Sequence, residues 1–395
     1  MHPLLASLAA GLDQRSAAGR ARRRPLVASR SDAATHVVVD GAERIAFCSN
    51  DYLGLADHPA VIEACITALR RWGVGSGASH LVSGHTAEHH ALEHELATLT
   101  GRPRAVLFST GYMANLAVVR ALAGRGDLVL EDRLNHASLI DAGLASGARL
   151  RRYPHADVAA LEARLAASAA APRKLVVTDG VFSMDGDVAP LAALAAACTR
   201  HGAMLHVDEA HGFGVLGPRG LGSVEAAGLG AEAVPSLMCT FGKALGTFGA
   251  FVAGPETLIE TLVQTAREHV YTTAVPPALA AATRAALAVA RDEPWRRERV
   301  LRLAAEFRAG AQALGLRLAA SSTPIQPAII GDERAALAAS AALHDAGFFV
   351  PAIRPPTVPA GSSRLRFTFS AAHHDLDLER LLAALATLAR RGLFA

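Results

Sequence analysis

The chain has 395 residues, of which 51% are hydrophobic, and its net charge is only +3. This length predicts two domains or one large domain with an appendage, and the hydrophobic content suffices for a sizeable core. So small a net charge argues against nucleic acid or a membrane as the main partner. The four cysteines are scattered, with no C-x-x-C pair, which fits a reducing cytoplasm.

The N-terminal segment, residues 1–50, is predicted to be partly helical and partly extended. Its first half carries an apolar stripe (Leu4, Leu5, Leu8, Leu12) followed by four arginines (Arg20, Arg22, Arg23, Arg24). No basic region precedes the apolar part, so a secretory signal is not expected, although the arginine-rich character slightly resembles an organelle transit peptide. We expect an amphipathic helix that packs on the protein itself or on a sister subunit.

Residues 51–290 are predicted to form a large α/β domain. Short β-rich runs alternate with helix-length segments, a pattern typical of a mainly parallel sheet between helices. The seven predicted strands span residues 104–108, 127–131, 148–153, 175–178, 204–208, 236–240 and 249–253. Ligands bind such sheets at the carboxyl ends of the strands, where polar residues follow several of these runs.

Residues 291–395 are predicted to form a small α+β domain. Helical spacing dominates over residues 278–316, so we expect the boundary between the domains within helix, near residues 285–295. Strands are expected over residues 325–330, 348–353 and 364–369, with helices over residues 333–346 and 375–391.

Lysine is rare in this chain, since only Lys174 and Lys243 occur among 39 basic residues. Lys243 follows a predicted strand and lies among small or apolar neighbours. Lysine can form an imine once it is desolvated, whereas arginine stays protonated. A chemical role for Lys243 is therefore one interpretation, and a surface lysine is the other.

An acid and a histidine follow the fifth predicted strand, in Asp208-Glu209-Ala210-His211-Gly212. Together with Lys243 they suit pyridoxal phosphate (PLP), whose aldehyde needs an amine and whose ring nitrogen needs a carboxylate. Asp208 alone would more simply cap a helix, but the combination is more specific.

Two loops add candidate ligands. Ser109-Thr110-Gly111-Tyr112 joins a strand to a helix, and free amides at a helix start attract phosphate. His136 lies in the loop after the second strand, where it could stack on a planar ring or cap a helix.

These residues resemble the α-oxoamine synthases, a family of fold-type I PLP enzymes, over nearly the whole chain. The resemblance rests on five segments: Ser49–Leu55, Gly75–Gly77, Thr178–Asp187, Asp208–Gly212 and Thr240–Lys243. It implies the fold-type I architecture, PLP as cofactor, and a homodimer in which two subunits build each active site. Asp179 departs from the family pattern, because glutamate is common at that position.

The resemblance also implies residue roles. Lys243 would bind the cofactor aldehyde and move the substrate Cα proton, Asp208 would pair with the ring nitrogen, and His136 would stack on the ring. The remaining implied cofactor contacts are Gly111, Tyr112, Ser183, His211, Thr240 and, towards a neighbouring subunit, Thr272 and Thr273. The implied substrate contacts are Arg22, Asn50, Arg354 and Thr357.

Within the family, residues 352–361 look like the subgroup that condenses L-alanine with a pimeloyl thioester and releases carbon dioxide. The thiol carrier would be coenzyme A or acyl-carrier protein. The alternative is a family member that uses glycine and a short acyl-CoA. A non-catalytic nucleotide-binding or nucleic-acid-binding protein is the alternative from another class.

We expect no metal site. His85 and His89, like His90 and His94, have the i, i+4 spacing of zinc ligands on a helix. No glutamate stands between them in the H-E-x-x-H order and no cysteine is near, so a solvated helix face is the preferred interpretation.

Overall fold

The seven predicted strands form one mixed sheet in the computed structural model, which describes residues 2–17 and 19–394. Strand β10 runs antiparallel to both of its neighbours, whereas the pairs from β9 to β6 are parallel. The spatial order is β4-β10-β9-β8-β7-β5-β6. The bounds are β4 Arg104–Phe108, β5 Leu128–Asp132, β6 Arg149–Tyr153, β7 Lys174–Asp179, β8 Met204–Asp208, β9 Ser236–Thr240 and β10 Ala250–Gly254.

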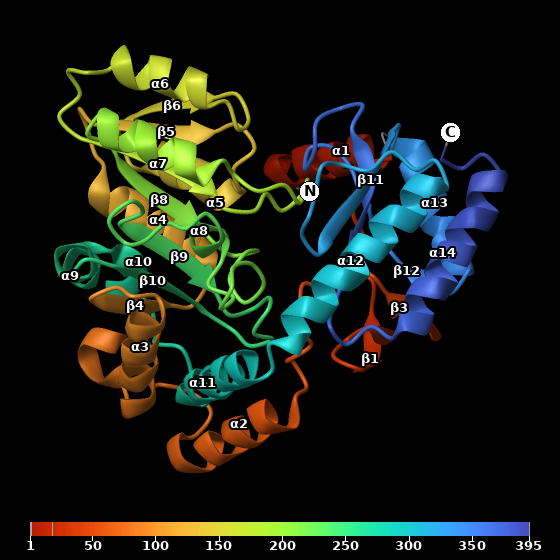
Figure 1. Ribbon diagram of the computed structural model, residues 1–395, viewed down its shortest axis with the longest axis horizontal. Coiled ribbons are helices and arrows are strands. Elements are labelled where there is room, and N and C mark those ends of the chain that lie inside the picture. The colour runs from red at the N-terminus through yellow and green to blue at the C-terminus, as the bar shows by residue number, and fades with distance from the viewer. Residues whose placement is uncertain (1, 18, 395) are drawn as a thin grey trace.

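Helices cover both faces of this sheet because its central strands are apolar on both sides (Figure 1). Alternation along β4 illustrates this: Val106 packs with α4 and α9, and Leu107 packs in the cluster that contains α3, α6, α7 and α11. The helical elements of this lobe are α2 Pro59–Trp72, η1 His80–Gly84, α3 Ala87–Leu99, α4 Gly111–Leu122, α5 Ala137–Ala145, α6 Val158–Ala166, α7 Leu191–Arg200, α8 Ser223–Ala226, α9 Glu256–Thr265, α10 Arg267–Val270 and α11 Pro277–Asp292.

A second, smaller lobe follows a break in the helical region at Glu293–Pro294. Proline lacks the amide that would continue α11, but its fixed φ suits a helix start, and α12 begins at the next residue. The elements of this lobe are α12 Trp295–Ala313, β11 Ile325–Gly331, α13 Glu333–Asp345, β12 Phe348–Phe349, β13 Ala352–Ile353, β14 Ser363–Thr368 and α14 Asp375–Arg390. Strands β11, β14 and β13 form an antiparallel sheet.

The single strand expected over residues 348–353 is wrong, because the structure splits it in two. Pro351 has no amide hydrogen to donate to a sheet and separates β12 from β13. Strand β13 pairs with β14, whereas β12 pairs with β3 of the N-terminal segment, Ile45 opposite Phe348.

The N-terminal segment therefore lies against the small lobe, as the adjacent red and blue ribbons of Figure 1 show. Its elements are α1 Pro3–Ala17, β1 Val27–Ser31, β2 His36–Val39 and β3 Ala42–Ala46. Helix α1 is the predicted N-terminal helix, but it buries none of its residues, and Leu12 is 67% exposed. Packing of this helix within its own chain is thus not observed, and the sister-subunit alternative stays a prediction.

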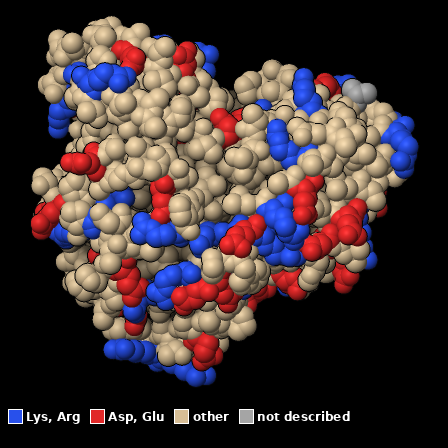
Figure 2. All heavy atoms as spheres, in the orientation of Figure 1, with Lys and Arg blue, Asp and Glu red and all other residues tan. Residues whose placement is uncertain are grey.

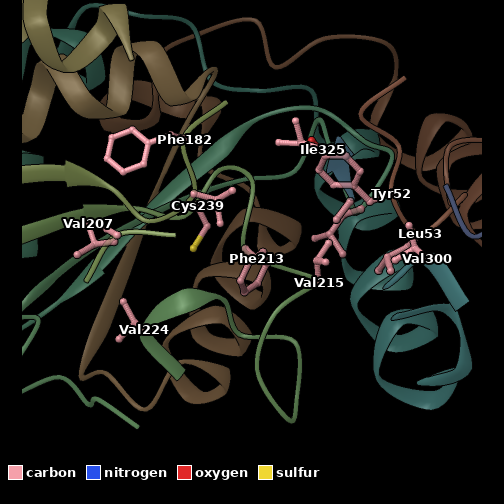
Figure 3. Close-up of a cluster of buried hydrophobic side chains, with 14 of the residues drawn as sticks. Tyr52, Leu53, Phe182, Val207, Phe213, Val215, Val224, Cys239, Val300 and Ile325 are labelled. Carbon is pink, nitrogen blue, oxygen red and sulfur yellow. The ribbon is translucent and has the colours of Figure 1, made fainter. Parts of the chain in front are cut away.

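One hydrophobic cluster connects the two lobes (Figure 3). Tyr52 and Leu53, which follow the N-terminal strands, lie in it with Val300 of α12, and Phe213 and Val215 extend it into the large lobe. A shared core of this kind fixes the position of the small lobe relative to the edge of the large sheet.

Acidic and basic side chains are interspersed on the face drawn in Figure 2, without one broad field of a single sign. This distribution agrees with the small net charge. Within residues 2–17 and 19–394, no helix combines the length and the apolarity that crossing a bilayer requires.

A histidine joins two carboxylates beside the parallel strands. His155 lies 3.0 Å from Asp132 at the end of β5 and 2.7 Å from Asp187 in the loop after β7. Burial lowers the pKa of His155, but the two hydrogen-bonded carboxylates outweigh it and raise the pKa to about 10. Protonated His155 therefore holds the β5 and β7 loops together.

Replacing this histidine should destabilise the protein in a pH-dependent way. Because its pKa rises on folding, its contribution is complete below about pH 6.5 and is lost as the pH rises towards 10. We expect His155→Gln to lower Tm by roughly 2–4 °C at pH 6 and by less at pH 9.5, measured by thermal unfolding. His344→Gln, on α13, is the control, and an equal loss of Tm at both pH values would contradict the assignment.

Candidate active site

A cleft of about 190 Å³ lies at the carboxyl edge of the large sheet. It brings together eight residues that the sequence predicted as cofactor contacts. The lining residues are Gly111, Tyr112, His136, Ser138, Asp179, Ser183, Asp208, Ala210, His211, Met238, Thr240 and Lys243.

Strand register explains this convergence. Asp179 and Asp208 are the last residues of the neighbouring strands β7 and β8 and are paired directly in the ladder, while Thr240 ends the next strand, β9. Parallel strands deliver their carboxyl ends to one edge of a sheet, so residues far apart in the sequence meet there.

Lys243 is the amine of the cleft. Burial lowers its pKa to about 8, and Arg366 acts in the same direction, whereas Asp208 and Asp179 oppose the shift. Roughly a tenth of the amine is therefore unprotonated at pH 7, far more than for an exposed lysine, and this is the form that attacks an aldehyde.

Asp208 is held by donors that the sequence did not reveal. Its Oδ1 accepts a hydrogen bond from the Ala210 amide at 2.8 Å, and its Oδ2 accepts one from Nδ2 of Asn115 at 2.7 Å. His206 lies 3.1 Å from Oδ1 of Asn115 and orients this amide, whose nitrogen also donates to Oγ of Ser138 at 2.8 Å. Two donors thus fix the side chain of Asp208 in a buried position.

His136 caps a helix, one of the two alternatives weighed for it, and stacking on a planar ring stays a prediction. It is the N-cap of α5, since its Nδ1 accepts a hydrogen bond from the Ser138 amide at 3.2 Å, and its ring also lines the cleft. An accepting Nδ1 places the ring proton on Nε2. Burial lowers the pKa of His136, so the ring is neutral.

Asp179, the departure from the family pattern, contributes to the same arrangement. Its Oδ2 accepts the backbone amide of His136 at 2.6 Å and thereby fixes the loop that carries this histidine. Burial, followed by repulsion from Asp208, raises its pKa well above the usual range.

The start of helix α4 offers backbone donors to the cleft. Thr110 caps the helix by accepting the Met113 amide at 3.2 Å, while Gly111 and Tyr112 occupy the first two helical positions, whose amides have no partner within a helix. A Cβ on Gly111 would lie 3.3 Å from Met238, so glycine suits this close approach. These donors are suited to an anion such as phosphate.

His211 occupies the wall nearer the small lobe. Burial, then the charges of Lys243 and Arg366, lower its pKa well below the usual range. The Tyr52 hydroxyl lies 2.7 Å from its Nδ1 and 3.2 Å from Oδ1 of Asn50. Asn50 is therefore connected to the cleft through Tyr52.

Arg366 is the charged residue that the sequence analysis missed. It belongs to β14 of the small lobe and is 8% exposed. Its Nε donates to the Ser183 carbonyl at 2.5 Å, and its terminal nitrogens lie 3.3 and 3.4 Å from Oδ1 of Asn50. Nothing in the sequence sets it apart from the 36 other arginines.

The other predicted substrate contacts form a second group beside the N-terminal segment, outside the residues that line the cleft. Arg22 donates to Oγ1 of Thr357 at 3.1 Å, and Arg354 donates to the Gly19 carbonyl. Arg20 instead forms an ion pair with Glu333 at 3.1 Å. The structure thus gives Arg20 and Arg22 different partners, which the sequence alone could not do.

Thr272 and Thr273 do not line the cleft of their own chain. They follow Tyr271, which is 72% exposed, and Thr273 pairs with Ser79 in an isolated bridge. Their predicted contact with a neighbouring subunit's phosphate remains a prediction.

These residues fit PLP. The cleft provides an amine of lowered pKa, a hydrogen-bonded carboxylate, a neutral imidazole and the start of a helix, which correspond to the aldehyde, ring nitrogen, ring face and phosphate of that cofactor. The fit rests on donors such as Asn115 as well as on the predicted residues.

Comparison with known proteins agrees with this geometry. A family model for class I and II aminotransferases matches residues 42–385. The 8-amino-7-oxononanoate synthase of Cellvibrio japonicus is 60% identical over 96% of this chain and 94% of its own length, and that of Methylococcus capsulatus is 64% identical over 92% and 94%. The chain belongs to the 8-amino-7-oxononanoate synthase family.

A solved relative confirms the predicted fold class. A serine palmitoyltransferase from S. paucimobilis, in complex with a PLP–myriocin aldimine, superposes with a TM-score of 0.92 at 32% identity, covering 98% of this chain and 97% of its own. Membership of the 8-amino-7-oxononanoate synthase family likewise confirms the resemblance stated from the sequence motifs.

The solvated helix face expected for the histidines is wrong in part. His85 precedes α3 and is not on the helix, and His89 is fully buried because its Nε2 lies 2.6 Å from the Val275 carbonyl. Long-range contact with the segment before α11 causes this burial, which helical spacing alone does not reveal.

Asn115 gives a testable account of how Asp208 is held. Asn115→Leu removes a donor to a buried carboxylate, worth about 1.5–3 kcal/mol. We expect roughly tenfold to hundredfold weaker PLP binding, measured by absorbance titration of the apoprotein. Ser236→Ala removes only the partner of Nδ1 of His206, the ring nitrogen that does not contact Asn115, and should have a much smaller effect. Wild-type affinity in a folded Asn115→Leu protein would disprove this role.

Proposed function

We propose that this chain is a PLP-dependent C-acyltransferase of biotin biosynthesis that condenses L-alanine with a pimeloyl thioester, releasing carbon dioxide and 8-amino-7-oxononanoate. The observation that carries the proposal is the cleft in which Lys243 faces Asp208, in a chain about 60% identical to synthases of this name. This geometry agrees with the PLP dependence that the sequence predicted.

In this reaction the bound cofactor supplies an electron sink for the negative charge that develops on the amino-acid Cα. The unprotonated Lys243 amine takes the Cα proton, and Asp208, fixed by Asn115, holds a proton on the ring nitrogen. A carbon–carbon bond then forms between Cα and the thioester carbonyl carbon, the thiol carrier leaves, carbon dioxide is lost, and a proton returns to Cα.

Two groups of residues would hold the two substrates. Arg366 lies beside the cleft, where it donates to the carbonyl of the lining residue Ser183 and contacts Asn50, and its guanidinium would suit the amino-acid carboxylate. Arg22, Arg354 and Thr357 lie together further out, where they would bind the pimeloyl chain and its terminal carboxylate.

We further propose a homodimeric, cytoplasmic enzyme with shared active sites. The exposed Tyr271 and Thr273, which flank the half-buried Thr272, and the exposed leucines of α1 support contact with a second copy. The four free cysteines agree with a reducing compartment. The thiol carrier can be coenzyme A or acyl-carrier protein.

Product analysis tests the proposal. The purified protein, loaded with PLP, should convert L-alanine and pimeloyl-CoA to 8-amino-7-oxononanoate, detected by mass spectrometry. Lys243→Ala should remove turnover and the protein's visible absorbance band, and borohydride should attach the cofactor to the peptide that contains residue 243.

The second lysine of the chain provides a matched control. Lys174 only donates to the His201 carbonyl at 3.0 Å, so Lys174→Ala should keep turnover and labelling. Full turnover in Lys243→Ala would refute the mechanism. Glycine with a short acyl-CoA as the preferred pair would refute the assigned substrates while leaving the cofactor chemistry in place.

Arg22 should govern recognition of the terminal carboxylate. Loss of a charged hydrogen bond predicts that Arg22→Ala raises KM for pimeloyl-CoA by roughly tenfold or more. The kinetics with an acyl-CoA of similar length but without that carboxylate should change little. Steady-state assays with both donors provide the measurement.

Arg24→Ala is the control for nearby positive charge. The prediction fails if Arg22→Ala affects both donors equally, or if Arg24→Ala reproduces its effect on pimeloyl-CoA.

A further inference from the structure

A second cavity, of about 340 Å³, lies apart from the active site, between η1, α3, β4 and α10. Five of the chain's 17 histidines line it, together with one carboxylate, one guanidinium and apolar residues. The polar lining residues are His80, His85, His90, Glu93, His94, Arg104 and His269, and Arg104 pairs with Glu260 at 2.8 Å. Element η1 is a π-helical turn, a rare conformation that often marks functional sites.

Three imidazoles converge beside this cavity, and two of them, His80 and His85, line it. One ring nitrogen each from His80, His85 and His89 lies within 4.8 Å of the others, and Nδ1 of His80 is 3.0 Å from Nδ1 of His85. Two ligands bound tetrahedrally to Zn²⁺ at 2.0–2.1 Å have nitrogens roughly 3.4 Å apart. A shift of a few tenths of an ångström would therefore let His80 and His85 share a metal ion.

We propose that this cavity binds one borderline divalent transition-metal ion, such as Zn²⁺, between Nδ1 of His80 and Nδ1 of His85. Neutral imidazole nitrogens are typical ligands for Zn²⁺, Ni²⁺ and Cu²⁺, whereas Mg²⁺ and Ca²⁺ require oxygen ligands. The cavity has the room for water to complete the coordination.

Glu93 is placed to become the outer partner of such a site if its carboxylate moves closer to His85. Its Oε2 lies 4.0 Å from Nε2 of His85, the ring nitrogen remote from the proposed ion, and its Oε1 is fixed by the Leu107 amide at 3.0 Å. Metal-binding histidines commonly donate their other N–H to a carboxylate, which sets the tautomer and strengthens the ligand.

His89 has a supporting role in the minimal site. Its Nδ1 accepts the Thr86 amide at 3.0 Å and its Nε2 lies 2.6 Å from the Val275 carbonyl, so both nitrogens are engaged. To become a third ligand it would have to release the Thr86 amide. The pair His80–His85 is therefore the core of the proposal.

The ion would stabilise the chain around η1. His80 stacks on His269 with ring centroids 4.9 Å apart, Ser79 pairs with Thr273, and Ser76 donates to the Val275 carbonyl at 2.7 Å. Metal binding at η1 would thus hold the segment that carries Thr272 and Thr273.

The test uses the full chain loaded with PLP, without an affinity tag and dialysed against a chelator. Calorimetric titration with Zn²⁺ should give one ion per chain with micromolar affinity, and Mg²⁺ should give no signal. His80→Ala and His85→Ala should each weaken Zn²⁺ binding at least tenfold. Zn²⁺ should raise Tm by a few degrees in the wild type only.

His94→Ala is the matched control, since His94 lines the same cavity outside the three converging rings, and it should bind Zn²⁺ as the wild type does. The proposal is overturned if the wild type shows no binding at 100-fold excess Zn²⁺, if His80→Ala and His85→Ala bind normally, or if His94→Ala loses binding equally. These readouts do not depend on catalytic activity, so the proposed reaction can fail without affecting them.

Discussion

Two acidic side chains placed side by side inside the protein are the constraint on which the active site depends. Asp208 ends a buried strand next to Asp179, and two adjacent buried carboxylates repel each other. Donors relieve this repulsion: Asn115 and the Ala210 amide hold Asp208, and the His136 amide holds Asp179. The amide that donates to Asp179 belongs to His136, whose imidazole lines the cleft. The contact that relieves the repulsion therefore also positions this ring.

The small lobe completes this arrangement by contributing a positive charge. Arg366 extends from β14 to the Ser183 carbonyl of the large lobe, and on the same strand Arg364 pairs with Asp185 at 2.6 Å. A relative movement of the lobes would break these contacts and remove a charge that lowers the pKa of Lys243. Arg366 therefore links the packing of the two lobes to the pKa of the Lys243 amine.

The sequence predicted the parts of the fold that local chemistry determines. The seven strands of the large sheet occur within about one residue of their expected positions, because apolar β-rich runs bounded by turns are local signals. Contacts between segments far apart in the chain could not be predicted from the sequence. Examples are the pairing of β12 with β3, the burial of His89 against Val275, and the contact of Asn115, in the middle of a helix, with Asp208. The eight predicted cofactor contacts that line the cleft follow strand ends or begin a helix, whereas Arg366 looks like any other arginine of the chain.

Amino-acid usage shows how strongly the chemistry constrains one position. This chain uses arginine for 37 of its 39 basic residues, so arginine evidently satisfies most surface and ion-pair roles here. At position 174 the lysine only donates to a carbonyl, a role that a guanidinium can also perform. At position 243 a guanidinium could neither lose its proton near neutral pH nor form an imine. Burial lowers the pKa of the Lys243 amine to about 8, so lysine can react at this position whereas arginine could not.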